Sequence, residues 1–164
     1  MNRRRVLSSA GAGGLAAATG CLVAETDPPA DLRNRPTVVV RLFYALAAKT
    51  DSGTEFARAI EPILHSVSPL QSVLMGRLGQ WRTARRSVVE NIAITAEKLA
   101  PDQVVGRASF STPAVADAAD ALAAENVVVE ATLDVSNVPE FGIDRRTQSW
   151  FLATEAGEWR LVWF

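Results

Sequence analysis

Apolar and polar residues alternate most regularly near the end of the chain, from residue 126 onward. This period of two is typical of β-strands with one buried face. The pattern predicts three consecutive antiparallel strands, Asn126–Ser136, Arg145–Glu155 and Glu158–Phe164. Gly157 lies between the last two, where it can supply the positive φ of a tight hairpin. The first strand should place Val127, Val129, Ala131, Leu133 and Val135 inward, and the acids Glu130, Asp134 and Glu158 should face solvent.

Apolar residues recur at helical spacing earlier in the chain. Pro36 suits the first turn of a helix that continues over Thr37–Lys49. A second helix should start at Thr54, and Pro62 should kink it or begin a fresh turn. The predicted inner faces are Val39, Leu42, Phe43 and Leu46 in the first helix, and Phe56, Ile60, Ile63 and Leu64 in the second.

The middle of the chain is less regular. Leu70–Gln80 is predicted to be helical, and Ser87–Leu99 alternates well enough to be the first strand of the sheet. Between them, Trp81–Arg86 is the basic cluster of the folded part. We interpret it as a solvated loop or strand edge, where arginines discourage edge pairing; contact with anionic lipid headgroups is the alternative.

One more helix is predicted before the last three strands. Thr112 is a capping residue, and Pro113 suits the first helical position. The helix should span Ala114–Glu125, with Val115, Ala118, Ala119 and Leu122 facing inward.

Composition limits the classes of protein that fit. The 164 residues suffice for one domain, and 48% hydrophobic with 21% charged residues is ordinary for a globular protein. The formal net charge is −1, and it becomes −4 without Arg3, Arg4 and Arg5. Such a charge does not indicate the basic surface that nucleic-acid binding requires. A single cysteine excludes an internal disulfide, and no apolar run approaches the length of a membrane-spanning helix.

The first 20 residues resemble an export signal of the twin-arginine type. Arg3 and Arg4 form the pair, and Ser8–Gly20 is a weakly apolar segment rich in small residues. Ala18-Thr19-Gly20-Cys21 then resembles a lipoprotein box, although Ala18 stands where Leu is usual. The resemblance implies cleavage before Cys21 and attachment of lipid to its sulfur.

The alternative is an ordinary cleavable signal with an incidental cysteine, or a buried structural thiol. We favour lipidation because the single Cys of the chain directly follows its single signal-like segment. The stretch 21–36 is rich in proline and charge and should be a flexible tether, which leaves 37–164 as the folded domain. Two acyl chains suffice for stable anchoring, so the bilayer is an expected partner at the extracytoplasmic face of the cell membrane.

The order of elements in 37–164 resembles the nuclear transport factor 2-like (cystatin-like) superfamily. The residues that carry the likeness are 42–46 in the first helix and 150–162 in the last two strands. The resemblance implies an α+β fold, a curved antiparallel sheet packed on N-terminal helices to make a cone. With the export signal, the chain looks most like small twin-arginine lipoproteins of haloarchaea, although its modest acidity departs from them.

Candidate chemistry is sparse. Enzymes of that superfamily, such as polyketide cyclase-like and ketosteroid isomerase-like members, handle protons inside the cone, and here only Tyr44 and His65 are candidates. Tyr44 is more simply a core residue, and His65 a surface or helix-capping one. One His and one Cys cannot make a metal cluster, and the chain has no Gly-rich phosphate loop, so no metal or other cofactor is expected.

Two hypotheses therefore stand. The first is a membrane-tethered binding or assembly module for a small apolar ligand, a protein partner or a second copy that docks on the sheet face. This hypothesis rests on the aromatic content of the last strands, in which Trp150 and Trp159 are predicted to lie on opposite faces of the sheet. The second, which we weigh below it, is an enzyme that uses Tyr44 or His65. Tyr44, His65 and Trp150 are the candidate pocket residues.

Overall fold

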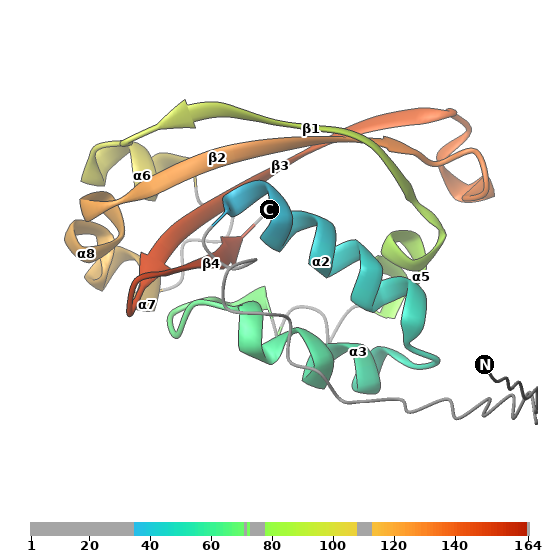
Figure 1. Ribbon diagram of the computed structural model, residues 1–164, viewed down its shortest axis with the longest axis horizontal. Coiled ribbons are helices and arrows are strands. Elements are labelled where there is room, and N and C mark those ends of the chain that lie inside the picture. Colours follow the sequence, from blue (N-terminus) through green and yellow to red (C-terminus); the bar gives the residue numbers. More distant parts are fainter. Residues whose placement is uncertain (1–34, 71, 73–77, 108–112, 164) are drawn as a thin grey trace, which may run out of the picture.

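The computed structural model describes residues 35–70, 72, 78–107 and 113–163, and these form an α+β structure. Helices pack on a four-stranded antiparallel sheet, as Figure 1 shows. The predicted fold class is thereby confirmed at the level of α+β with helices on an antiparallel sheet.

The sheet is a simple meander in which each strand lies beside its neighbour in sequence. Its strands are β1 (Val88–Glu97), β2 (Asn126–Asp134), β3 (Arg145–Glu155) and β4 (Glu158–Trp163). The four predicted strands are confirmed: β1 and β2 are slightly shorter than predicted, β3 has its predicted bounds, and Phe164, the predicted end of β4, lies outside the described residues. The β3–β4 hairpin turns on Ala156 and Gly157, whose φ values of 54° and 80° are those of a type I′ turn.

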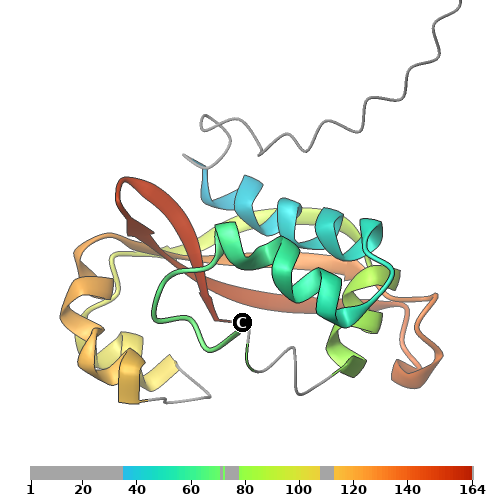
Figure 2. The same ribbon diagram turned by 90° about the horizontal axis from the view of Figure 1, so that it is seen from below.

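One face of the sheet is covered by the N-terminal helices, as the view from below shows (Figure 2). These are α2 (Pro36–Lys49), α3 (Gly53–Ile60), the 3₁₀ turn η1 (Glu61–Ile63) and α5 (Leu78–Arg86). Pro36 stands in the first turn of α2, as predicted, and Pro62 marks the change from α-helix to 3₁₀ turn. Ser52 caps α3 by accepting a hydrogen bond from the Glu55 N–H at 3.1 Å.

The prediction of a loop or strand edge at Trp81–Arg86 is wrong, because these residues belong to α5. Trp81 is buried and donates its indole N–H to the Thr50 hydroxyl oxygen at 3.1 Å, which ties α5 to the end of α2. The arginines remain on the exposed side of α5, where Arg85 pairs with Asp51 at 3.2 Å. The predicted helix 70–80 lies largely outside the described residues.

A second helical layer packs on the opposite face of the sheet, near the start of β2. It consists of α6 (Pro101–Arg107), α7 (Pro113–Asp117) and α8 (Ala119–Ala124). The predicted single helix 114–125 is wrong in its continuity, because Ala118 adopts φ −94° and ψ 5° between α7 and α8. The predicted cap at Thr112 lies outside the described residues.

This second layer changes the burial of β2. Val128 points away from α2 yet is 2% exposed, because it packs with Phe151 and Trp163 beneath the second layer. The first half of β2 is therefore buried on both faces, whereas the sequence pattern predicted one.

Candidate functional site

Two of the three candidate pocket residues, Tyr44 and Trp150, lie together in the core between α2 and the sheet. They belong to a cluster of four aromatic side chains with Phe43 and Phe56. Ring centroids are 4.5 Å apart for Phe43 and Trp150, and 5.8 Å apart for Tyr44 and Trp150. These separations are those of rings in direct edge or tilted contact. The four rings thus fill the space between α2, α3 and β3.

The environment of Tyr44 favours a neutral phenol. Burial raises its pKa well above the ordinary value of 10.0, while the Trp150 indole and the Arg146 charge oppose that shift only in part. A phenol with such a pKa stays protonated at physiological pH, so it is a poor base. Tyr44 acts here as a core residue.

The prediction that Trp150 and Trp159 line opposite faces of the sheet is wrong. Trp159 pairs with Thr154 across the hairpin, and Thr154 lies on the same face of β3 as Trp150 because side chains alternate along a strand. Both tryptophans pack against the core beneath the N-terminal helices, Trp150 fully and Trp159 in part.

His65, the third candidate, lies elsewhere, in the segment that follows η1 along β4. Leu64 forms a parallel bridge with Leu161, and the His65 N–H donates to the Leu161 carbonyl at 2.9 Å. Three residues later the Ser68 hydroxyl donates to the Val162 carbonyl at 2.7 Å. The segment therefore covers the edge of β4 that would otherwise be open to another strand.

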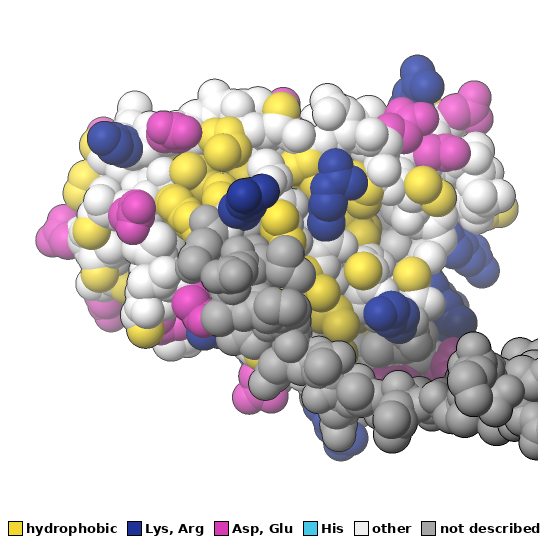
Figure 3. All heavy atoms as spheres, in the orientation of Figure 1, with side chains coloured by type: hydrophobic (Ala, Val, Ile, Leu, Met, Phe, Trp, Pro, Cys, Tyr) yellow, Lys and Arg dark blue, Asp and Glu magenta, His cyan; other side chains and the backbone are white. Residues whose placement is uncertain are grey.

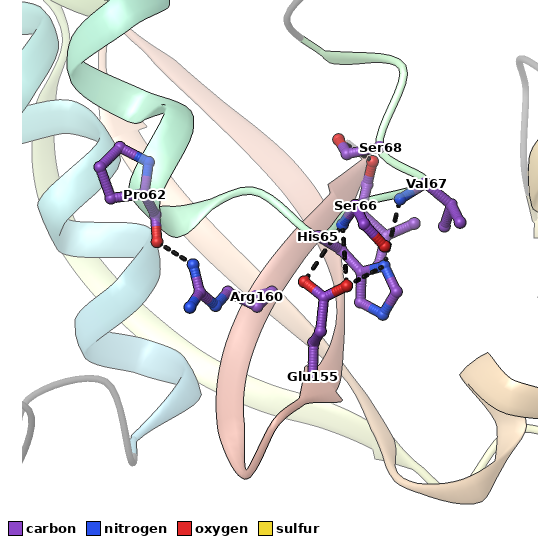
Figure 4. Close-up of polar contacts among 8 residues, drawn as sticks. Pro62, His65, Ser66, Val67, Ser68, Glu155 and Arg160 are labelled. Carbon is purple, nitrogen blue, oxygen red and sulfur yellow. Dashed lines mark hydrogen bonds and ion pairs between the residues drawn. The ribbon is translucent and has the colours of Figure 1, made fainter.

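The His65 imidazole meets the carboxylate of Glu155, which closes the β3–β4 hairpin (Figure 4). Its Nδ1 lies 3.9 Å from Glu155 Oε1 and accepts a hydrogen bond from the Val67 N–H at 3.3 Å. The neutral ring must then carry its proton on Nε2. The imidazole is 10% exposed, so the prediction of a surface or helix-capping role is wrong.

Glu155 and Arg160 complete a small polar cluster. Both carboxylate oxygens of Glu155 accept from the Ser66 N–H, at 3.3 and 3.2 Å. The Arg160 guanidinium donates to the Pro62 carbonyl and pairs with Glu158 at 2.6 Å. These contacts join η1 and the following segment to the hairpin.

The electrostatics of the cluster follow from burial and from these neighbours. Burial lowers the pKa of His65 below its ordinary 6.5; Glu155 opposes the shift, and Arg160 adds to it. Burial alone would raise the pKa of Glu155, but the hydrogen bonds from Ser66 and the charges of His65 and Arg160 bring it below 4.5. With its proton on Nε2, the neutral imidazole donates no hydrogen bond to the Glu155 carboxylate, and the two groups form an ion pair only when His65 is protonated.

The open half of the outer sheet face is polar. Its side chains come from the middle of β1, β2 and β3, and they include Asn91, Glu130, Thr132, Thr147 and Ser149. Because the other half lies under α6–α8, this face offers hydrogen-bonding groups rather than a broad apolar surface.

Arg3, Arg4 and Cys21 lie outside the described residues. Within the described ranges, no group of His, Cys, Asp and Glu could hold a metal ion. In the same part of the chain, no helix is long and apolar enough to cross a membrane. Comparison with known proteins finds no match to any family model, curated protein or solved structure.

Sequence reasoning identified His65 but missed Glu155 and Arg160 as its neighbours. Glu155 is separated from Ser66 by 89 positions, and no local pattern links them. The one available signal was the hairpin itself, since a two-residue turn after Glu155 fixes where that carboxylate must stand.

Proposed function

We propose that this chain is an exported lipoprotein, anchored through Cys21 at the extracytoplasmic face of the cell membrane. The domain 37–164 serves there as a binding or assembly module with a nuclear transport factor 2-like, cone-shaped fold. One observation carries the proposal: the single cysteine of the chain directly follows its single signal-like segment, behind Arg3 and Arg4.

The described residues support a module more than an enzyme. Tyr44 is buried against the rings of Phe43 and Trp150, and its raised pKa keeps it protonated, so it is poorly suited to act as a base. The polar outer half of the sheet supports docking of a protein partner or a second copy through hydrogen bonds. A small apolar ligand remains within the proposal.

A second function is favoured by the pairing of His65 with Glu155. A polyketide cyclase-like or ketosteroid isomerase-like enzyme could use His65 as its base, with the Val67 N–H orienting the ring and Glu155 stabilising the imidazolium that forms. General base catalysis typically raises the rate of a reaction by 10²–10⁴-fold. His65→Gln should therefore lower any such activity by about that factor, whereas Tyr44→Phe should not.

The test of anchoring is fractionation of cells that possess twin-arginine export. We expect the wild-type chain in the membrane pellet, resistant to high salt and released by detergent. Cys21→Ser should move the protein from the pellet to the soluble fraction. Without acyl chains, the weakly apolar segment Ser8–Gly20 would be the one remaining membrane-binding element, and a single weak element does not anchor a protein stably. Arg3→Lys with Arg4→Lys should keep the full-length precursor in the cytoplasm. Cys21→Ser that stays in the pellet as firmly as wild type would overturn the proposal.

A further inference from the structure

The solvent-facing side of α2 carries basic and small side chains with no acid among them. Arg41, Ala45, Ala48 and Lys49 are all exposed, and their spacing puts them on one face of the helix. The α2 sequence, PTVVVRLFYALAAK, contains no Asp or Glu, and the exposed Arg35 precedes it. We call Arg35, Arg41, Ala45, Ala48 and Lys49 the α2 stripe.

Most basic residues in the other described helices lie near acids, although α5 itself contains no Asp or Glu and its Arg82 is exposed. Arg85 and Arg86 of α5 pair with Asp51 and Glu140. Arg58 of α3 lies between Glu55 and Glu61 in sequence. Among the described helices, α2 and α5 are those whose own sequences carry only positive charge; α2 is the longer of the two and lies nearer to Cys21 in the chain.

The second helical layer has the opposite character. Asp102, Asp117 and Asp120 are exposed on α6, α7 and α8. In Figure 3 some Lys and Arg side chains lie across the middle of the view, over the α2 region, whereas the Asp and Glu side chains lie mainly at the margins, together with the other Lys and Arg side chains. The domain is thus electrically asymmetric although its total charge is small.

The position of α2 along the chain places its positive face close to the proposed lipid anchor. Only 14 residues separate Cys21 from Pro36. If this stretch is the flexible tether that its composition predicts, its root-mean-square span is roughly 20 Å. If Cys21 carries lipid, the α2 stripe stays close to the bilayer, and contact brings it within the screening length of about 8–10 Å.

We infer that the α2 stripe docks on the anionic lipid surface of the bilayer that holds Cys21, with α6–α8 turned away from it. The inference rests on the proposed lipid anchor. Each basic residue near an anionic surface favours docking, and together Arg41 and Lys49 raise the ratio of docked to undocked protein by on the order of tenfold or more. The aspartates of α6–α8 oppose the inverted orientation.

The chain supplies its own control, because Lys49 and Lys98 are its two lysines and both are exposed. Lys49 lies in the α2 stripe, and Lys98 lies at the far end of β1. The experiment is lysine acetylation of the full chain, purified from membranes and reconstituted into vesicles. Vesicles of phosphatidylcholine alone are compared with vesicles that also contain phosphatidylglycerol, and mass spectrometry follows each lysine and the lipid on Cys21.

We expect anionic vesicles to slow acetylation of Lys49 about tenfold relative to neutral ones, with Lys98 unchanged and the protection lost in high salt. Arg41→Gln should weaken the protection of Lys49, whereas Arg58→Gln, the matched change on α3, should not. Equal protection of both lysines, or none, on protein with lipidated Cys21 would overturn the docking inference alone. An unmodified Cys21 would overturn the anchor, and the docking inference with it.

Discussion

Replacing Asn126 should destabilise the domain more than any exposed polar substitution, because this side chain joins three elements. It is 1% exposed at the start of β2. Its Oδ1 accepts from the Leu99 N–H at 2.7 Å, and its Nδ2 donates to the carbonyls of Leu99 and Leu122 at 3.0 Å each. It thereby holds the end of β1 and the end of α8 against β2.

The magnitude follows from these bonds. Asn126→Ala removes three hydrogen bonds, each with a net contribution of about 1 kcal/mol, and it leaves three buried backbone groups without this partner. We expect a loss of about 3 kcal/mol or more in the free energy of unfolding. With a urea m value of roughly 1–3 kcal/mol per M for a small domain, the midpoint should fall by about 1–3 M.

Urea denaturation followed by circular dichroism measures this loss. Asn91→Ala is the matched control, since Asn91 is exposed on β1 and its replacement should change stability by less than about 0.5 kcal/mol. Asn126→Asp should be at least as harmful as Asn126→Ala at neutral pH, because a carboxylate would face two carbonyls. Protonation at low pH should relieve part of that penalty. An Asn126→Ala midpoint equal to that of Asn91→Ala would refute the reasoning.

Three further predictions concern separate contacts. Trp81→Phe should cost about 1–2 kcal/mol by removing the hydrogen bond to Thr50. Thr50→Val also removes the bond from its hydroxyl to the Leu46 carbonyl, yet the double variant should lose less than the sum of the two single losses; full additivity would show that Trp81 and Thr50 do not interact. The pKa of His65 is lowered on folding, so its contribution to stability is complete above pH 6.5 and declines as the pH falls toward the pKa of the folded state. His65→Gln should therefore flatten the pH dependence of the urea midpoint in that range. An unchanged slope would argue against a lowered pKa for His65. Ala156→Asn should raise stability by up to about 1 kcal/mol, since Asn tolerates the positive φ of this turn position better, and a drop in the thermal midpoint would contradict the assigned turn.

The elements that the sequence predicted well are those with strong periodicity. The alternation in β2 and the helical spacing of Val39, Phe43 and Phe56 locate a strand and two helices without tertiary information. The predictions made from Pro36, Pro62 and Gly157 were equally reliable, because the backbone preferences of proline and glycine act locally, without tertiary contacts.

The errors arose where tertiary contacts decide. Helix α5 has a polar outer side, and the partner that holds Trp81 is Thr50, 31 residues away. Helix α6 was missed, although Pro101 at its start and the Gln103 side chain, which accepts from the Ala100 N–H at 3.0 Å, are ordinary helix-start signals. The unbroken apolar run from Val127 to Val129 was the available sign that β2 is covered on both faces.

The candidate site could be predicted only in its parts. Tyr44, His65 and Trp150 attract attention as side chains able to bind or transfer protons. Their separation into an aromatic core and a polar cluster depends on how the sheet folds over α2. No local pattern reports that His65 will meet Glu155, because the contact is made by the pairing of a loop with the edge of β4.

The measurement that tests the central claim most directly is the mass of the N-terminal peptide of the protein extracted from membranes. The account predicts that this peptide begins at Cys21 and carries a diacylglyceryl group on the sulfur, with Arg3 and Arg4 removed. A peptide that extends upstream of Cys21, or that contains Cys21 with an unmodified thiol, would contradict the claim of a lipid anchor.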